Sequence, residues 1–342
     1  MIEQGVPLAP FTTLELGGPA EYFVRAGDRA TLVDALRWAH ARGLPVRVIG
    51  GGSNLVIADE GLPGLTIKVE TRGVRSTHAA DGCVELEVDA GEPWDKLVER
   101  SVEEDLAGLE CLSGIPGLAG ATPIQNVGAY GQEVAETVRR VELLERDTLQ
   151  VVTHTHAHCG FSYRDSNFKR EPDRWVVLSV TFALRKGGAA SLRYAELARA
   201  VAGQATLRET RRAVLELRRN KSMVLDPSDE NRRSVGSFFL NPVLRAEQLG
   251  ELAQRAQAAP PVFAADGGSK VPAAWLIERA GFTKGQRTGH VGISSRHALA
   301  LVHHGGGTSV ELLGFARLIR DQVRARFGVT LEPEARLLGL TM

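Results

Sequence analysis

The first segment of this chain whose composition suggests ligand chemistry is a run of three glycines, a serine and an asparagine. Gly50, Gly51, Gly52, Ser53 and Asn54 directly follow a β-branched run, Val46 to Ile49, that predicts a strand. The backbone N–H groups of such a loop can surround a pyrophosphate, and the two polar side chains add further donors. The segment lacks the ending of a Walker loop, and an isolated run of this kind is also typical of a tight surface turn.

A second glycine-rich segment covers residues 106–132. Apolar residues separate its glycines, which is typical of an ordered ligand-binding loop and unlike a linker. Gly114, Gly117 and Gly120 are spaced GxxGxxG, whereas a Rossmann domain has GxGxxG at the start of a helix. The sequence therefore does not predict a classical NAD-binding fold.

Three scattered polar residues are candidates for catalysis. Ser237 stands beside Phe238 and Phe239, where its hydroxyl can be shielded from water and aimed at one substrate atom. It is not in a GxSxG nucleophile elbow, and a strand serine bonded to the backbone is the plainer explanation. Arg164 and Glu334 are charged residues whose commoner fate is an ordinary ion pair.

A metal site is a weaker hypothesis. His154, His156 and His158 alternate and would share one face of a strand, but neighbours on one strand do not readily close a tetrahedron around zinc. The three cysteines, Cys83, Cys111 and Cys159, are far apart and lack CxxC spacing, so we expect small core residues in a reducing compartment. We therefore predict no metal.

The composition of the chain excludes several classes of protein. Its 342 residues contain 41 Lys plus Arg and 41 Asp plus Glu, so no bulk charge favours nucleic acid or an anionic membrane surface. The 43% of hydrophobic residues and 24% of charged residues are values of ordinary globular proteins. No secretory signal is visible, and the longest apolar stretch, around Trp175 to Leu184, is too short to cross a bilayer. A globular protein of two to three domains is expected.

Hydrophobic periodicity places these segments between short helices and strands. We expect a helix after Asp28, with Leu32, Leu36 and Ala39 on one face, and a final helix from the cap at Thr308 to Gly328. Further helices are predicted at Trp94–Val102, Thr206–Arg219, Ala246–Gln257 and from Pro272, and strands at Val46–Ile49, Leu65–Val69, Val84–Val88, Val138–Leu144, Trp175–Leu184 and Val235–Leu240. An extended tail follows the final helix.

Five segments, read in order, resemble the UDP-N-acetylenolpyruvoylglucosamine reductase family of flavoenzymes. They are IGGGSNLVI, SGIPGLAGATPIQNVGAYGQEV, FSYRDSNFK, GSFFLNP and LEPEARLLG, and the resemblance runs from about Thr12 to Leu338. Tyr194 in LRYAEL and the form SFFLNP resemble the subclass with an extra tyrosine-bearing loop. The resemblance implies an α+β protein with a two-part FAD-binding domain of the vanillyl-alcohol-oxidase/p-cresol-methylhydroxylase type and a smaller C-terminal α/β substrate-binding domain. The implied boundaries are 1–72 with 328–342, then 73–222, then 223–327.

The resemblance also implies which residues hold the cofactor, a non-covalent FAD. They are Gly50, Gly51, Gly52, Ser53, Asn54, Leu55, Ile115, Pro116, Gly117, Thr122, Asn126, Gly128, Ala129 and Arg336. NADPH is the implied co-substrate, and UDP-N-acetylglucosamine-enolpyruvate is the implied substrate. For that substrate the implied contacts are Tyr163, Tyr194, Lys221, Asn241 and His297, where His297 stands in place of the Gln or Asn that family members often carry.

The implied reaction gives roles to the three scattered polar residues. Hydride delivered to the terminal vinyl carbon leaves negative charge on the carbon beside the carboxylate, and by resemblance Arg164 and Glu334 stabilise that charge. Ser237 then matches the proton donor to this carbon. The implied setting is peptidoglycan precursor synthesis in the cytoplasm, with roles in cell-wall biogenesis, cell shape, cell division and the cell cycle.

Two other functions stay open on the sequence alone. One is a flavin-dependent oxidase of the same cofactor fold, which needs no Ser237 proton donor. The other is a non-catalytic FAD-binding or nucleotide-sugar-binding protein, which the presence of all three catalytic residue types disfavours.

Overall fold

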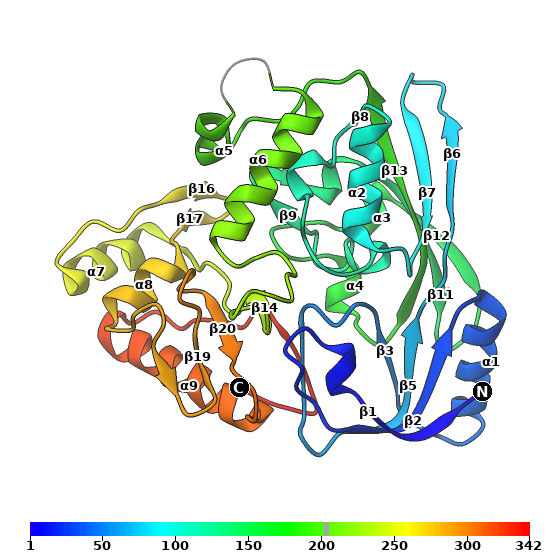
Figure 1. Cartoon of the computed structure of the whole chain (residues 1–342), viewed down its shortest axis with the longest axis horizontal. Coiled ribbons are helices and arrows are strands. Elements are labelled where there is room, and N and C mark those ends of the chain that lie inside the picture. Colours follow the sequence, from blue (N-terminus) through cyan, green and yellow to red (C-terminus); the bar gives the residue numbers. More distant parts are fainter. Residues whose placement is uncertain (202–204) are drawn as a thin grey trace. The chain divides into compact units, whose positions relative to one another are not determined.

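The computed structural model describes residues 1–201 and 205–342. Its contacts divide the chain into two compact units, each drawn from separate stretches of sequence (Figure 1). Unit 1 contains Met1–Val6, Ala20–Gly51 and Pro63–Val224, and unit 2 contains Pro7–Pro19, Gly52–Leu62 and Leu225–Met342. The predicted three-part division at residues 72, 222 and 327 stays a prediction.

The first sheet of unit 1 carries the strand that leads into the glycine run. Its order is β1 (Glu3–Pro7), β2 (Pro19–Ala26), β5 (Leu62–Val69) and β3 (Val46–Ile49), with β3 and β5 parallel. Helix α1 (Arg29–His40) buries Leu32, Leu36 and Ala39 in a core shared with residues of this sheet. Asp28 caps the helix by accepting a hydrogen bond from the Thr31 N–H at 2.7 Å. The predicted helix and the strand after it are confirmed.

The second sheet of unit 1 is antiparallel and larger. Its order is β12 (Val151–Thr155), β11 (Val138–Glu145), β13 (Trp175–Lys186), β7 (Val84–Asp89) and β6 (Val74–His78), and β8 (Leu106–Ala107) also pairs with β13. The residues from Val176 to Phe182 are buried on both faces of the sheet. This burial explains why β13 lacks an alternating pattern, and it confirms the predicted buried strand.

Two helices of unit 1 are joined by a charged pair. Helix α6 (Leu207–Asn220) begins at the predicted capping box of Thr206 and Glu209. Arg211 of this helix donates two hydrogen bonds, of 2.6 and 3.0 Å, to the carboxylate of Asp95 on α2 (Trp94–Glu103). The shorter elements of unit 1 are η2 (Glu110–Leu112), η3 (Ala119–Ala121), β9 (Gly128–Ala129), β10 (Gln132–Glu133), η4 (Val134–Glu136), α3 (His156–Cys159), α4 (Asn167–Arg170) and α5 (Ala195–Ala200).

The large hydrophobic core of unit 2 consists mainly of residues 235–335, and the N-terminal part of the chain contributes Leu14, Leu16 and Val56 to it. Its sheets have the orders β14-β20-β19-β18, β15-β17-β16 and β21-β4, the last pair being parallel. The strands are β4 (Leu55–Ile57), β14 (Ser234–Ser237), β15 (Val243–Leu244), β16 (Phe263–Ala265), β17 (Gly268–Lys270), β18 (Arg287–Thr288), β19 (Val291–Ile293), β20 (Ala300–His303) and β21 (Arg336–Leu338). The helices are η1 (Ala9–Phe11), α7 (Ala246–Ala256), α8 (Ala273–Arg279) and α9 (Ser309–Phe327), and α9 has the predicted cap at Thr308 and the predicted end at Gly328.

Four sequence predictions are wrong in detail. The strand expected at Val235–Leu240 ends at Ser237, because the residues that follow bond to the C-terminal tail. Pro272 is the N-cap of α8 and not its first helical residue. Of the three alternating histidines only His154 lies in a strand, since the chain turns into α3 after Thr155. Cys83 is half-buried beside a turn and is not a core residue.

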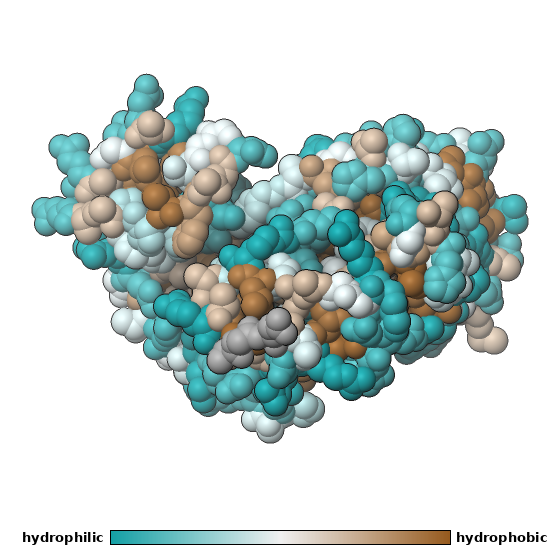
Figure 2. Space-filling view, turned by 90° about the horizontal axis from the view of Figure 1, so that it is seen from above, coloured by the Kyte–Doolittle hydropathy of each residue, from teal (hydrophilic) through white to brown (hydrophobic). Residues whose placement is uncertain are grey.

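The face drawn in Figure 2 is mostly hydrophilic, with hydrophobic residues exposed in small groups. Exposed large hydrophobic residues of unit 2 include Val243, Val262 and Phe263, near β15 and β16. Within residues 1–201 and 205–342, no helix is long and apolar enough to cross a membrane.

Candidate active site

In unit 1 the two glycine-rich segments meet. A Cβ added to Gly51 would lie 2.8 Å from the Gly117 Cα, and one added to Gly50 would lie 3.5 Å from the Leu118 side chain. The Lys68 ammonium donates to the Gly50 carbonyl at 3.1 Å and so fixes the start of the loop. The absence of a side chain at Gly51 therefore allows two predicted cofactor-binding segments to touch through their backbones.

The chain passes from unit 1 to unit 2 between Gly51 and Gly52. Gly52 has φ +66°, and a Cβ there would lie 1.8 Å from the Phe11 carbonyl oxygen. Its own carbonyl accepts a hydrogen bond from the Thr13 N–H at 3.2 Å. Only glycine fits this left-handed position without displacing backbone, so the loop geometry requires the residue type that the sequence provides.

The serine–glutamate strip is our name for residues 237–240, 332–336 and 54–55 of unit 2, which are joined by backbone hydrogen bonds. The Glu334 N–H donates to the Phe238 carbonyl at 2.8 Å, and the Leu240 N–H donates to the Glu332 carbonyl at 2.9 Å. On the other side of the tail, the Asn54 amide donates to the Glu334 carbonyl at 3.1 Å. The strip therefore brings Ser237, Glu334 and Arg336 together with the end of the glycine loop, from parts of the sequence as much as 280 residues apart.

The backbone of this strip is anchored by the core and by pairing. Phe238 and Phe239, next to Ser237, are fully buried and contact each other edge to face. Leu55 of β4 pairs with Arg336 of β21, and Ser237 pairs with Ala300 of β20. Such anchoring fixes a half-buried serine on a regular element.

Two predicted substrate residues of unit 2 have local structural contacts. The Asn241 side-chain oxygen accepts a hydrogen bond from the Ala273 N–H at 2.8 Å, at the start of α8. The His297 Nδ1 accepts one from the Leu299 N–H at 3.0 Å, and the Leu299 carbonyl bonds to the Phe238 N–H. His297 is therefore connected through Leu299 to the backbone beside Ser237, whereas Asn241 holds the start of α8.

In unit 1, Arg164 lies in a loop tied to the second glycine segment. Its backbone is left-handed, with φ +54°, and its guanidinium donates to the Gly128 carbonyl at 2.5 Å. The same guanidinium lies 5.4 Å from the centre of the Tyr163 ring. The Asn126 amide donates to the Ser162 carbonyl at 3.0 Å, so two bonds hold the arginine loop on residues 126–128.

Not every predicted cofactor residue presents its side chain to a ligand. Asn126 is 1% exposed, and its side chain bonds to Glu133, to Ser162 and to the Ala135 N–H. The buried Thr122 hydroxyl donates to the Ala119 carbonyl at 2.8 Å. Both side chains fold the glycine segment, so any contact of theirs with a cofactor would involve the backbone.

Two tyrosines and two cations form a cluster elsewhere in unit 1. Tyr194 contacts Tyr130 edge to face, with ring centres 5.5 Å apart, and the Lys221 ammonium lies 5.7 Å from the centre of the Tyr130 ring. Lys221 forms a 2.6 Å ion pair with Glu196. Burial raises the pKa of Tyr130 to about 12, so its hydroxyl keeps its proton. The structure thus brings together the predicted substrate residues Tyr194 and Lys221.

Arg218 belongs to the same cluster and was not among the predicted site residues. Its guanidinium donates to the Met223 carbonyl at 2.5 Å, while its buried Nε has no hydrogen-bond partner among the residues that the structure describes. Burial lowers the pKa of Arg218, because a buried guanidinium is poorly solvated. A buried arginine with a spare donor is suited to an anionic ligand. Its only sequence signal is a run of basic residues that is typical of an exposed helix end.

The two units fit the group that the resemblance implies. Gly51 and Gly117 form a backbone approach that a Cβ would fill, Gly52 needs a glycine conformation, and glycine N–H groups suit a pyrophosphate. No group of three or more His, Cys, Asp or Glu side chains within the described ranges could hold a metal ion. The glycine-rich backbone of the two segments suits a cofactor that bears a pyrophosphate.

Comparisons with known proteins agree with this assignment. Residues 20–153 match a family model described as FAD binding domain, and residues 226–338 match one described as UDP-N-acetylenolpyruvoylglucosamine reductase, C-terminal domain. A reductase of that name from Saccharopolyspora erythraea is 50% identical over 99% of this chain and 96% of its own length, and one from Thermobifida fusca is 47% identical over 99% and 98%. The crystal structure of UDP-N-acetylenolpyruvylglucosamine reductase from Thermus caldophilus covers 99% of both chains, with a TM-score of 0.69 and 25% identity. These matches confirm the predicted fold class.

Proposed function

Because the chain belongs to the UDP-N-acetylenolpyruvoylglucosamine reductase family, we propose that it reduces the enolpyruvyl ether of UDP-N-acetylglucosamine-enolpyruvate to UDP-N-acetylmuramate. The protein is an FAD-containing oxidoreductase, with NADPH as co-substrate. When bound, FAD supplies the redox chemistry, accepting hydride from NADPH and giving hydride to the double bond. The observation that carries the proposal is the serine–glutamate strip, in which Ser237 and Glu334 lie next to the end of the glycine loop.

Ser237, Glu334 and Arg164 divide the remaining chemistry. Hydride addition to the terminal vinyl carbon requires a proton at the carbon beside the carboxylate, and the Ser237 hydroxyl donates it. Arg164 and Glu334 stabilise the negative charge that develops on this carbon and its carboxylate before that proton arrives. Arg164 suits the role because its guanidinium is permanently charged and its loop is bonded to Gly128.

The glycine loop and the second glycine segment hold the cofactor in this proposal. Gly50 and Gly51, with Ile115, Pro116 and Gly117, offer backbone groups in unit 1. Gly52, Ser53, Asn54 and Leu55 do so in unit 2, and Arg336, which pairs with Leu55, is a further proposed contact. Thr122, Asn126, Gly128 and Ala129 complete the set as backbone contacts.

The tyrosine–cation cluster binds the nucleotide sugar. Lys221 and Arg218 offer positive charge to its diphosphate, and Tyr194 offers an aromatic face and a hydroxyl. Tyr163, Asn241 and His297 are the further proposed contacts. Since the proposed product is a precursor of the bacterial cell wall, the proposal extends to a cytoplasmic location and to roles in cell shape and division.

The test is the visible spectrum of the FAD-loaded protein under anaerobic conditions. Addition of NADPH should bleach the flavin, and addition of UDP-N-acetylglucosamine-enolpyruvate should restore its absorbance. If the absorbance returns only with oxygen, the protein is an oxidase of the same fold and the proposal is wrong.

Ser237→Ala tests the assignment of the proton donor. Bleaching by NADPH should keep its rate, whereas recovery with the substrate should slow by about 10²–10⁴-fold. Ser269→Ala on β17, which lies outside the proposed site, is the matched control. Equal recovery rates in the two variants would refute the role of Ser237.

A further inference from the structure

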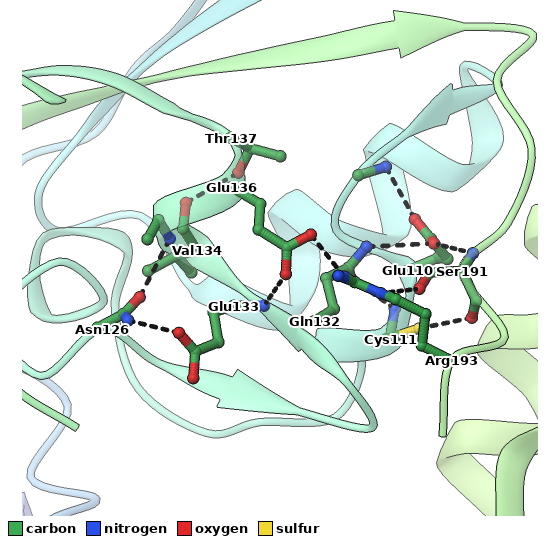
Figure 3. Close-up of polar contacts among 12 residues, drawn as sticks. Glu110, Cys111, Asn126, Gln132, Glu133, Val134, Glu136, Thr137, Ser191 and Arg193 are labelled. Carbon is green, nitrogen blue, oxygen red and sulfur yellow. Dashed lines mark hydrogen bonds and ion pairs between the residues drawn. The ribbon is translucent and has the colours of Figure 1, made fainter. Parts of the chain in front are cut away.

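A buried acid in unit 1 joins segments that are distant in sequence (Figure 3). Glu110 is 1% exposed and accepts hydrogen bonds from the Gly108 N–H at 2.8 Å, the Gln132 amide at 3.2 Å and the Ser191 N–H at 2.9 Å. Three donors on one buried carboxylate hold the two later segments against the Glu110 turn. Ser191 stands three residues before Tyr194, and Gln132 belongs to the β9–β10 hairpin.

The Ser191 backbone is held at its carbonyl as well. The Cys111 thiol donates to the Ser191 carbonyl at 3.2 Å, and the Cys111 N–H donates to the Gln132 side chain at 3.0 Å. Burial raises the pKa of Cys111 to about 12, so the thiol retains the proton that it donates. Glu110 and Cys111 together therefore fix both polar backbone groups of Ser191.

Arg193 extends the network toward the hairpin. Its Nε donates to the Ser191 hydroxyl at 3.2 Å, and its Nη2 donates to the Glu136 carboxylate at 2.5 Å. Glu136 in turn accepts from the Glu133 N–H at 2.9 Å. A Cβ on Gly131 would lie 3.3 Å from the Arg193 Cβ and 3.4 Å from the Tyr194 nitrogen. The Tyr194 segment therefore lies directly on the turn of the hairpin.

The same hairpin supports the arginine loop. Gly128 accepts the bond from Arg164, and Glu133 accepts a 2.7 Å bond from Asn126, whose amide also holds the Ser162 carbonyl. One short hairpin thus contacts the segments of both Tyr194 and Arg164. A shift of this hairpin would move both side chains.

We propose that Arg193 and Glu110 are positioning residues, which hold the Tyr194 segment on the β9–β10 hairpin. Because the hairpin also holds the Arg164 loop, the two residues fix the position of Tyr194, which contacts the nucleotide sugar, relative to Arg164. This inference rests on the proposed function, because it assumes that Tyr194 contacts the nucleotide sugar. Neither Arg193 nor Glu110 touches the reacting atoms. Their effect is on affinity for the nucleotide sugar and on the order of residues 188–200.

The two residues should act with different strengths. The Arg193–Glu136 pair is 57% and 41% exposed, so its loss should raise KM for the nucleotide sugar only about two- to fivefold. Glu110→Gln places an amide NH₂ against at least one N–H donor in a buried site, so KM should rise at least tenfold. In both variants the rate of flavin reduction by NADPH should stay within about twofold of wild type.

The experiment compares Arg193→Gln and Glu110→Gln with the control Arg100→Gln. Arg100 forms an ion pair with Glu104 of similar exposure, 41% and 43%, outside the network. Steady-state assays give KM and kcat, stopped-flow gives the rate of flavin reduction, and hydrogen–deuterium exchange follows amides of residues 188–200. The Ser191 amide should exchange faster than in wild type in both network variants, and its exchange rate should be unchanged in the control. Arg193→Glu alone should raise KM, and the double variant Arg193→Glu with Glu136→Arg, which restores the ion pair with reversed charges, should undo part of that rise.

The outcomes separate the inference from the proposed function. If wild-type flavin does not recover with the nucleotide sugar, the proposed function fails. If wild type recovers but Arg193→Gln matches Arg100→Gln in both KM and exchange, only the inference is overturned. If Glu110→Gln does not fold, the Arg193 and Glu136 variants decide, because these exposed side chains are dispensable for the core.

Discussion

Replacing Gly52 by alanine should lower the free energy of unfolding of unit 2. The added Cβ would lie 1.8 Å from the Phe11 carbonyl oxygen and 2.8 Å from the Thr12 Cα, and the Gly52 backbone has φ +66°. These neighbours do not yield readily, because the Thr12 hydroxyl is bonded to the Ala9 and Leu16 carbonyls at 3.1 and 3.0 Å. Backbone must therefore move.

Three costs contribute to the expected effect. A left-handed backbone costs a residue with a Cβ about 1–2 kcal/mol relative to glycine. Overpacking against fixed atoms costs about 1–3 kcal/mol. The bond from the Thr13 N–H to the Gly52 carbonyl, worth about 1 kcal/mol, is weakened as the loop shifts. Together these costs give an expected loss of about 2–6 kcal/mol, a large part of the ~5–15 kcal/mol that stabilises a typical domain.

Gly50→Ala is the matched control in the same loop. Its Cβ would meet only the Leu118 side chain, at an ordinary contact distance of 3.5 Å. Its effect on stability should be within about 0.5 kcal/mol.

The assay is urea and thermal unfolding of the FAD-free protein, so that cofactor contacts do not enter. The midpoint for Gly52→Ala should fall by about 2–4 °C for each kcal/mol, if the unit unfolds cooperatively as a domain of ~150 residues. A loss below 1 kcal/mol for Gly52→Ala, or an equal loss for Gly50→Ala, would refute the steric reasoning.

Asp95→Asn should lower stability by about 1–2 kcal/mol at pH 7, because it breaks the paired bonds to Arg211, and urea unfolding measures this. Burial raises the pKa of Asp95, but hydrogen bonds from Arg211 and the Gly114 N–H act in the opposite direction, and the net pKa is lowered. The difference in stability between Asp95→Asn and wild type should therefore shrink below about pH 4, where the wild-type carboxylate becomes protonated. A difference that does not depend on pH would contradict this. Iodoacetamide at pH 8 should label Cys83 in the native protein and spare Cys111 and Cys159, whose pKa values burial raises to about 12; equal labelling by mass spectrometry would show that both thiols are accessible. For the same two thiols the unfolded chain ionises first, so stability should fall between pH 9 and pH 12 by on the order of 1 kcal/mol per thiol per pH unit, and a flat profile in chemical unfolding would exclude the effect.

Local patterns in the sequence predicted many of the helices and strands. Helix starts are marked by Asp28, by the pair Thr206 and Glu209, and by Thr308, whose side chains bond to N–H groups three residues away, so neighbours in sequence carry the whole signal. The strand expected to reach Leu240 was wrong because its end depends on the C-terminal tail. Residues 235–240 contain no pattern from which their hydrogen bonds to the C-terminal tail could be predicted.

The arrangement of the site was harder to predict than its residues. The family resemblance identified Ser237, Glu334 and Asn54 as site residues. It could not predict their arrangement from neighbouring residues, because the hydrogen bonds of their backbone join segments that are far apart in the sequence. Glu110 and Arg218 had no distinguishing signal, because a buried acid and a buried arginine look like surface residues in the sequence. The side chains of Thr122 and Asn126 match the family motif, yet their bonds lie within the fold.

The pairing of β4 with β21 has a consequence for how the chain is made. A ribosome releases Leu55–Ile57 long before Arg336–Leu338, so β4 has no partner strand during most of synthesis. Leu14, Leu16 and Val56 likewise cannot be buried until the core formed by residues 235–335 has been synthesised. Closing so long a loop slows folding, and an apolar strand awaiting its partner is open to wrong pairing. Residues 336–338, which are synthesised long after β4, therefore complete this pairing, and a chain cut before Arg336 would leave the end of the glycine loop without its neighbouring strand.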